Sequence, residues 1–139
     1  MLKKSNFNLI KRLPVENFYS KSSELNVYNI NKLIKNFNTK RFFIVRTYGA
    51  TQKGKHAHFK SKQLLFSISG KIKLKVTDTV NHKILILHEK STIVYIPPLI
   101  WATQIYSENS ILGVFTDTIY NEKDYIRDYK DYKKIMNNS

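Results

Sequence analysis

Two histidines separated by a single residue are the first feature of the sequence that can do chemistry. His56 and His58 stand on either side of Ala57. In a β-strand, side chains at positions i and i+2 project from the same face, so both imidazoles can enter one cavity. Because an imidazole titrates near ~6.5, such a pair is suited to proton transfer at neutral pH. The spacing therefore predicts an acid–base site, and two unrelated surface histidines are the alternative.

The ligands around this pair are too few for a usual metal site. The chain has four histidines and no cysteine, and the nearest matching side chain after the pair is the amide of Gln63. Divalent metals in proteins are held by several basic or anionic ligands, and an amide coordinates weakly. We expect neither a metal nor another cofactor. A metal-dependent enzyme remains an alternative. His88 could then supply a third ligand, although its spacing from the pair does not indicate this role.

Short strands at roughly regular intervals surround the histidine pair. They are rich in β-branched and aromatic residues, and residues 71–76 alternate strictly between lysine and an apolar residue, which is typical of a half-buried strand. Such a series favours an antiparallel sandwich or barrel. Residues 1–39 are expected to be irregular, with one or two short strands. The other predicted strands are residues 40–46, 63–68, 71–76, 82–88, 92–96, 100–106 and 110–116.

The C-terminal segment changes to a helical period. Tyr125, Tyr129 and Tyr132 follow the spacing i, i+4, i+7, which places them on one face of a helix. Asn121 is suited to cap its N-terminus. We expect a helix over about residues 121–136, with its tyrosine face packed on the barrel rather than on a ligand.

Length and composition indicate one globular domain. The chain has 139 residues, of which 42% are hydrophobic, and this allows one core and excludes an intrinsically disordered chain. The absence of cysteine excludes a disulfide scaffold and is compatible with a reducing compartment. The apolar runs are shorter than the ~20 residues of a membrane helix, and the N-terminal residues lack the apolar segment of a signal peptide. We expect a soluble, cytoplasmic protein without a membrane partner.

The charge is strongly positive, with 24 Lys and Arg against 10 Asp and Glu and a formal net charge of +14. Basic domains often bind nucleic acids. Here the cations are scattered, and neither a long Lys/Arg block nor an RNA-binding motif is present. We therefore expect no nucleic-acid partner, although a basic nucleic-acid binder stays as an alternative. A positive field also attracts a small phosphate-bearing ligand.

The histidine pair belongs to a longer pattern. The spacing His-x-His-x4-Gln-x6-Gly resembles the first motif of the cupin superfamily, with glutamine in place of a metal-binding glutamate, and is formed here by His56, His58, Gln63 and Gly70. The second cupin motif can be matched at Pro97. There, Leu99 and Ala102 stand where that motif has a glycine and a histidine.

Further residues narrow the resemblance to one family. Trp101 in the second motif and the run Asp124-Tyr-Ile-Arg-Asp-Tyr129 are similar to those of the sugar 3,4-ketoisomerases, which are small WxcM-like cupins. The similarity covers roughly residues 40–135. It implies a cupin-type jelly-roll β-barrel over about residues 40–118, followed by the helix, in a single domain of residues 1–139. It also implies a homodimer.

The resemblance further implies a reaction. Members of this family convert dTDP-4-keto-6-deoxyglucose into a dTDP-3-keto-6-deoxyhexose without a metal. The product feeds an aminotransferase on the route to 3-amino-3,6-dideoxy sugars, such as those of lipopolysaccharide O-antigens. Moving the ketone from C4 to C3 needs a base for the C3 proton, an enediol and a proton delivered to C4. We expect His56 and His58 to perform these transfers, and the sequence leaves open which of them is the base.

Residue types suggest how such a substrate is bound. A guanidinium or an ammonium suits the diphosphate, and an aromatic face suits the thymine. The candidate substrate-binding residues are Arg46, Tyr48, Lys53, Gln63, Trp101 and Tyr106. The chain departs from the family pattern at three places. Lys53 stands where the family has an arginine, Phe42 and Phe43 where it has tyrosine, and Ala102 where it has a histidine. These replacements leave a non-catalytic nucleotide-sugar-binding module as the alternative function.

Overall fold

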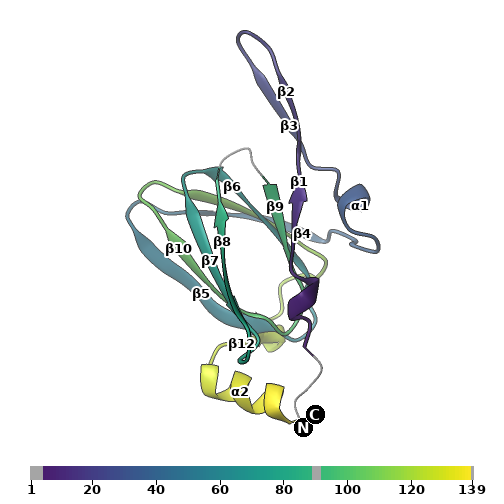
Figure 1. The fold of residues 1–139 in the computed structure, drawn as a ribbon, viewed down its shortest axis with the longest axis vertical. Helices are drawn as coiled ribbons and strands as arrows, with labels where there is room; N and C mark the ends of the chain where they lie inside the picture. The colour runs from purple at the N-terminus through teal and green to yellow at the C-terminus, as the bar shows by residue number, and fades with distance from the viewer. Residues whose placement is uncertain (1–4, 89–91, 139) are drawn as a thin grey trace.

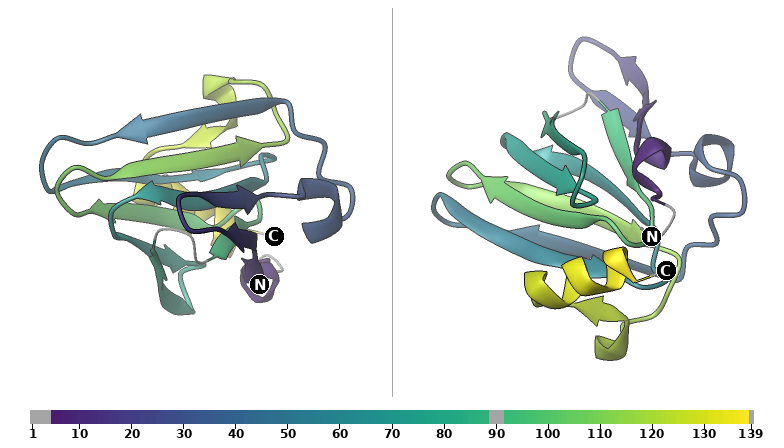
Figure 2. Two further views of the ribbon diagram at one scale, coloured as in Figure 1. Left: turned by 90° about the horizontal axis from the view of Figure 1, so that it is seen from above. Right: turned by 60° about the horizontal axis from the view of Figure 1, so that its bottom comes forward.

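Two antiparallel five-stranded sheets face each other in this protein. The computed structural model describes residues 5–88 and 92–138. One sheet has the order β1-β9-β6-β11-β4 and the other β12-β5-β10-β7-β8, and they form the two layers seen in Figures 1 and 2. Their strands are β1 (Lys11–Pro14), β4 (Arg41–Arg46), β5 (Thr51–His58), β6 (Gln63–Ser69), β7 (Ile72–Thr77), β8 (His82–Leu87), β9 (Thr92–Ile96), β10 (Trp101–Tyr106), β11 (Ile111–Thr116) and β12 (Tyr125–Ile126). The predicted cupin-type barrel is confirmed.

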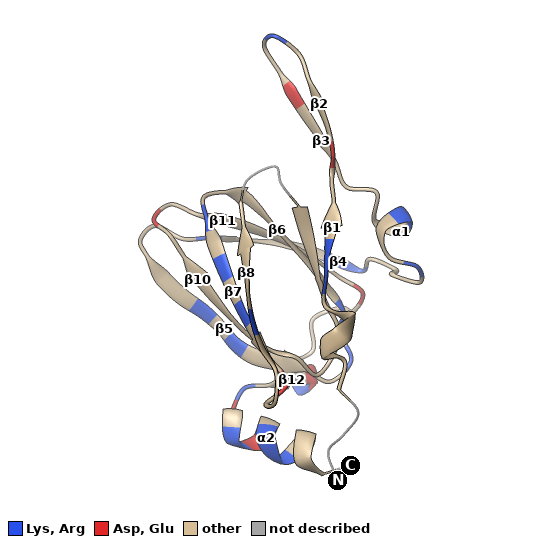
Figure 3. Ribbon diagram, in the orientation of Figure 1, with Lys and Arg blue, Asp and Glu red and all other residues tan. Residues whose placement is uncertain are grey.

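The core lies between the two sheets and follows the alternation of the strands. In β7, Ile72, Leu74 and Val76 are buried, whereas Lys73 and Lys75 are exposed on the outer face. Figure 3 shows these lysines as blue bands on β7. Each fully buried Leu or Ile contributes about 1.5–3 kcal/mol to the free energy of unfolding. The lysine row is therefore the solvated face of a half-buried strand, as its alternation predicts.

The N-terminal segment is more ordered than the sequence predicts. Strand β1 pairs with β9 and extends one sheet of the barrel beyond residues 40–118. Strands β2 (Glu16–Tyr19) and β3 (Glu24–Val27) form a separate hairpin that projects from the barrel (Figure 1). A 3-10 turn η1 (Phe7–Leu9) precedes β1, and the short helix α1 (Ile30–Leu33) follows the hairpin. Residues 1–4, 89–91 and 139 of the predicted domain lie outside the described residues.

The predicted start of the C-terminal helix is wrong. Helix α2 spans Tyr129–Asn137, and its N-cap is Asp128, whose carboxylate accepts hydrogen bonds from two backbone amides of the first turn. Asn121 caps a 3-10 turn instead, η2 (Glu122–Asp124). Tyr125 then lies in β12, which pairs with β5. Pairing with a sheet edge satisfies the backbone polar groups of this segment, and the tyrosine spacing gives no indication of such an edge.

The face of α2 that meets the barrel carries the remaining tyrosines. Tyr132 and Met136 are buried, and the hydroxyl of Tyr132 donates to the carbonyl oxygens of Thr77 and Leu99 at 3.0 and 2.9 Å. This contact fixes the helix against the outer side of the β5–β10–β7 sheet. None of the helices in the described part of the chain is long and apolar enough to cross a membrane.

Candidate active site

A cavity of about 390 Å³ opens between the two sheets. Its volume lies within the range of small-molecule sites. One sheet supplies side chains from β4 and β6, and the other supplies side chains from β5, β10, β12 and the residues after β12. The lining residues are Phe43, Val45, Gln52, Lys53, Gly54, His56, Gln63, Gln104, Tyr125 and Arg127.

A β-bulge aims two of these side chains into the cavity. Lys53 pairs with Gln104 and His56 pairs with Ala102, so β5 takes three steps where β10 takes two. Gly54 and Lys55 hold the extra residue with φ values of 81° and 55°, the left-handed conformation of such bulges. Strict alternation would place Lys53 and His56 on opposite faces. The bulge instead turns an ammonium and an imidazole toward the same space.

His58 is held by a carboxylate. Its Nδ1 lies 3.0 Å from Oδ2 of Asp124, and the two side chains are only 6% and 12% exposed. The same carboxylate accepts hydrogen bonds from the backbone amides of Lys60 and Ser61 at 2.8 and 3.3 Å. With Nδ1–H donating to Asp124, the lone pair of a neutral His58 lies on Nε2, away from the carboxylate. This is the arrangement of an oriented general base.

The imidazoles are kept neutral. Burial and, to a smaller extent, the nearby His58 lower the pKa of His56 to about 4. Burial also lowers the pKa of His58, although the hydrogen bond to Asp124 opposes this effect. Nδ1 of His56 and Nε2 of His58 are buried without a hydrogen-bond partner in the part of the chain that the structure describes. Because buried polar atoms are seldom left unpaired, these two nitrogens are candidates for hydrogen bonds with a ligand.

Tyr125 lies against both histidines. Its ring centroid is 4.4 Å from that of His58 and 5.0 Å from that of His56, and the two imidazoles are 4.9 Å apart. The guanidinium of Arg127 lies 4.3 Å above the Tyr125 ring. Tyr125 is in register with His58 because β12 pairs with β5. The segment after β11 thus brings a carboxylate, a phenol and a guanidinium to one site.

The structure brings together half of the predicted site residues. His56, Lys53 and Gln63 line the cavity, and His58 lies beside it in contact with His56 and Tyr125. Phe43 lines the cavity, whereas Phe42 points to the opposite face of β4 and is 46% exposed.

Four predicted substrate-binding residues lie elsewhere. Arg46 is on the opposite face of β4 from Phe43 and Val45, and Tyr48 is 81% exposed beyond the end of that strand. Trp101 packs on Tyr129 and Tyr132 of α2, outside the barrel. Tyr106 is 1% exposed in the core, where its hydroxyl donates to Gln104. These four residues are predicted from their residue types, and residue type alone does not indicate toward which side of the sheet a side chain points.

Four residues of the site are not among those predicted from the sequence, namely Gln104, Asp124, Tyr125 and Arg127. The run at residues 124–129 was the available signal, because it carries the family resemblance. Its tyrosine spacing predicts a helical face outside the barrel, whereas Tyr125 lies in β12 beside β5. Within residues 5–88 and 92–138, no group of three or more His, Cys, Asp and Glu side chains is arranged to hold a metal ion.

Comparisons with known proteins show the family of the chain. The family model described as "FdtA: WxcM-like, C-terminal" matches residues 7–137. TDP-4-oxo-6-deoxy-alpha-D-glucose-3,4-oxoisomerase of Aneurinibacillus thermoaerophilus is 30% identical over 102 residues, which cover 72% of this chain and 73% of that protein. Both findings confirm the resemblance that the motifs carry.

Solved structures of ketoisomerases share the fold. WlaRA, a TDP-fucose-3,4-ketoisomerase from Campylobacter jejuni, is 30% identical, with a TM-score of 0.82 over 93% of this chain and 96% of its own. A histidine-to-asparagine mutant of the 3,4-ketoisomerase QdtA from Thermoanaerobacterium thermosaccharolyticum, in complex with TDP-4-keto-6-deoxyglucose, is 26% identical, with a TM-score of 0.85 over 91% and 93% of the two chains. The protein therefore belongs to the FdtA family of WxcM-like C-terminal domains.

Proposed function

We propose that the chain is a sugar 3,4-ketoisomerase that converts TDP-4-keto-6-deoxyglucose into a TDP-3-keto-6-deoxyhexose without a metal. The observation that carries this proposal is the pair His58–Asp124, which is buried beside His56. Each imidazole has a nitrogen that no residue in the described part of the chain hydrogen-bonds. A ketone shift between neighbouring carbons is a proton-transfer reaction, and such a pair supplies a neutral, oriented base. Two of the relatives are named as isomerases of TDP-linked sugars, and the third is a ketoisomerase variant in complex with TDP-4-keto-6-deoxyglucose, which supports this substrate class.

The carbon chemistry is assigned to His58. Its Nε2 takes the proton from C3, and the electrons of that C–H bond form the C3=C4 double bond while the C4 carbonyl oxygen becomes an oxyanion. The resulting imidazolium is stabilised by Asp124 at 3.0 Å. The imidazolium then returns its proton to C4, and the C3 hydroxyl gives its proton to the group that protonated the C4 oxygen, so that the 3-ketone forms and the enzyme is regenerated. Electrons and protons balance without an oxidant.

The oxygen chemistry is assigned to the other groups around the pair. Tyr125 is the one tyrosine among the residues that line the cavity, and its hydroxyl can both donate and accept. It is placed to protonate the developing oxyanion, a role that preorganised donors fill at low cost. His56 stays neutral because of its lowered pKa, so it serves as a hydrogen-bond partner of the sugar. Lys53 supplies positive charge for the diphosphate.

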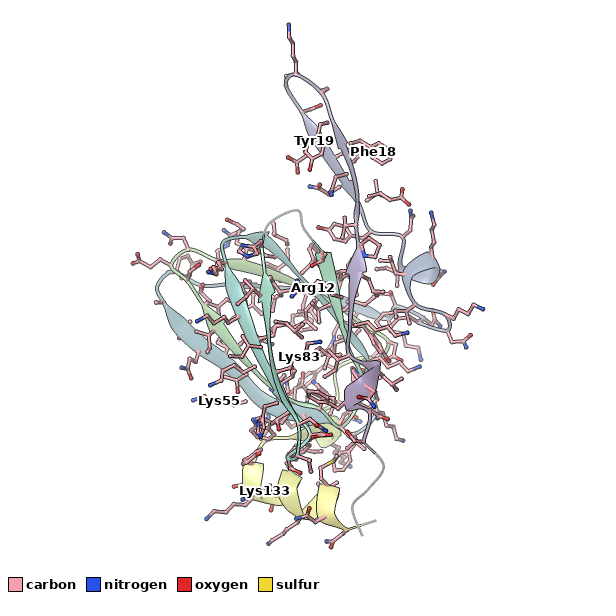
Figure 4. The ribbon with its side chains drawn as sticks, viewed as in Figure 1. Arg12, Phe18, Tyr19, Lys55, Lys83 and Lys133 are labelled. Carbon is pink, nitrogen blue, oxygen red and sulfur yellow. The ribbon has the colours of Figure 1, made fainter. Side chains whose placement is uncertain are left out.

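The assembly is proposed to be a homodimer in the cytoplasm. The hairpin β2–β3 projects from the barrel and carries Phe18 and Tyr19 (Figure 4). Phe18, Tyr19 and Leu25 of this hairpin are 55%, 68% and 58% exposed. An isolated two-stranded hairpin is only marginally stable in water, so apolar side chains at this position favour packing on a second copy. The absence of cysteine is compatible with a reducing compartment. Light scattering coupled to size-exclusion chromatography measures the mass of the assembly. The substitution Phe18→Ser should lower this mass toward that of a monomer.

The function is tested by incubating the purified protein with TDP-4-keto-6-deoxyglucose in the presence of a chelator. NMR follows the sugar, and calorimetry in parallel measures binding. Appearance of the 3-keto product supports the proposal. Saturable binding without conversion would contradict it in favour of a nucleotide-sugar-binding module. Activity that the chelator removes and a divalent cation restores would contradict the metal-free chemistry.

A further inference from the structure

The guanidinium that faces the cavity is already occupied by a carboxylate of the same chain. Nη2 of Arg127 donates to Oε2 of Glu122 at 2.9 Å, and Nε donates to Oε1. Oε2 also accepts from the hydroxyl of Tyr120 at 2.6 Å. The result is a bidentate pair in which two carboxylate oxygens fill the fork of the guanidinium. Two oxygens of a phosphate fill this fork with the same geometry.

Arg127 stands where a substrate diphosphate would need a partner. It is the one arginine among the residues that line the cavity, and Lys53 lines the same cavity from β5. Its guanidinium lies 4.3 Å above the ring of Tyr125, which contacts both imidazoles. A diphosphate bound between Arg127 and Lys53 would therefore hold the sugar beside the histidines.

A more highly charged anion can displace the carboxylate of Glu122 from the guanidinium of Arg127. The side chains of Arg127 and Glu122 are 52% and 54% exposed. Exposed ion pairs contribute little to stability, because water and salt screen them. The hydrogen bonds from Arg127 and Tyr120 lower the pKa of Glu122 to about 2, so the carboxylate remains charged at neutral pH. A diphosphate carries more charge and can contact both cations, Arg127 and Lys53.

We infer that Glu122 occupies the diphosphate-binding fork of Arg127 in the free protein and yields it when the nucleotide-linked sugar binds. The inference rests on the proposed substrate. The carboxylate of Glu122 then competes with ligands for Arg127 and lowers the affinity of the protein for anions that bind Arg127 alone. A ligand with a diphosphate between Arg127 and Lys53 overcomes the competition, whereas a monophosphate or inorganic phosphate does so poorly. The pair thereby favours nucleoside diphosphates.

The inference is tested by calorimetric titration of the full chain with TDP at low ionic strength. Glu122→Gln should tighten binding about two- to fivefold, because the competing charge is removed. Arg127→Ala should weaken binding about tenfold or more. Glu16→Gln is the matched control, since it breaks a similar exposed pair with Lys32 at 3.1 Å far from the cavity. It should leave the affinity within about 1.5-fold.

A double variant separates competition from general charge effects. In the Arg127→Ala background, Glu122→Gln should no longer tighten binding beyond the effect of Glu16→Gln. Tyr120→Phe, which removes one partner of Glu122, should give a smaller tightening than Glu122→Gln. Unchanged affinity of the folded Glu122→Gln variant would overturn the exchange, and unchanged affinity of Arg127→Ala would overturn the diphosphate role. A wild-type protein that binds no TDP would instead contradict the proposed substrate itself.

Discussion

Asp124 lies 3.0 Å from Nδ1 of His58, although 66 residues separate the two along the chain. The contact exists because β12 pairs with the end of β5 and sets Tyr125 opposite His58. A carboxylate in this position fixes the proton on Nδ1 and leaves the lone pair on Nε2. The chain after the barrel therefore determines which nitrogen of His58 can act as a base.

Asp124→Asn is expected to lower kcat about 10²- to 10⁴-fold with little change in KM. The amide keeps its oxygen for the backbone donor of Lys60 at 2.8 Å and gives up only the longer 3.3 Å contact with the amide of Ser61. Its NH₂ group, however, donates to Nδ1 of His58 and moves the imidazole proton to Nε2, where the base is needed. Steady-state kinetics measure the effect, and circular dichroism checks the fold. Asp131→Asn, on the first turn of α2, is the matched control, and equal losses in both variants would contradict the assignment.

At the bulge, Gly54→Ala should lower the free energy of unfolding, whereas Lys55→Gly should leave it nearly unchanged. At Gly54, φ is +81° and a Cβ atom would lie 3.1 Å from the carbonyl oxygen of Ala102. Gly54→Ala should therefore destabilise the protein by about 1–2 kcal/mol and lower activity by displacing Lys53 and His56.

Lys55→Gly tests the same bulge from the other side. Since Lys55 already has a φ of 55°, glycine there should leave the free energy of unfolding within about 0.5 kcal/mol. Lys73→Gly, in the regular strand β7, should cost about 1 kcal/mol and is the reference. Denaturant unfolding measures all three variants. A large loss in Lys55→Gly would show that the residue matters for more than its conformation.

Stability should fall at mildly acidic pH because of His56. Its pKa is about 4 in the folded protein and ~6.5 in the unfolded chain. The unfolded chain thus binds more protons between these values, so the stability present above pH ~6.5 is lost as the pH falls toward 4. At pH 5 the loss from this group is on the order of 2 kcal/mol. His56→Gln should remove most of that loss and exposed His82→Gln should not, as unfolding at pH 7.5 and 5 can measure. Equal pH dependence in the three proteins would contradict the buried neutral state.

Lys53 should act on binding rather than on chemistry. Lys53→Ala is expected to raise KM for the TDP-sugar about tenfold while kcat changes less than twofold. Lys53→Arg should retain most of the affinity, because a guanidinium also binds a diphosphate. Lys73→Ala, on the outer face of β7, removes the same charge away from the cavity and is the control. A fall in kcat without a change in KM would place Lys53 in the chemical step instead.

Much of the fold and the histidine pair could be predicted because both depend on local spacing. The lysine alternation of residues 71–76 determines which face of β7 is buried, and the spacing of His56 and His58 puts both imidazoles on one face. In both segments the strand alternation of the sequence is kept in the structure, so that the buried face follows from the sequence alone.

The rest of the site depends on contacts that no local pattern contains. Tyr125 has helical spacing with Tyr129, yet pairing with β5 puts it in a strand. Trp101 and Ala102 are neighbours on β10, and only the sheet register decides that Ala102 faces His56 while Trp101 faces α2. Lys53 faces the cavity because of an extra residue in β5, which alternation cannot predict.

The central claim is that His58 removes the C3 proton, and solvent exchange tests it most directly. Wild type, His58→Asn and His56→Asn are incubated with TDP-4-keto-6-deoxyglucose in D₂O with a chelator, and NMR follows the C3 proton of the substrate and the formation of the 3-keto product. We predict loss of the C3 signal with wild type, a slower loss with His56→Asn and none with His58→Asn. Undiminished exchange in His58→Asn would contradict the account.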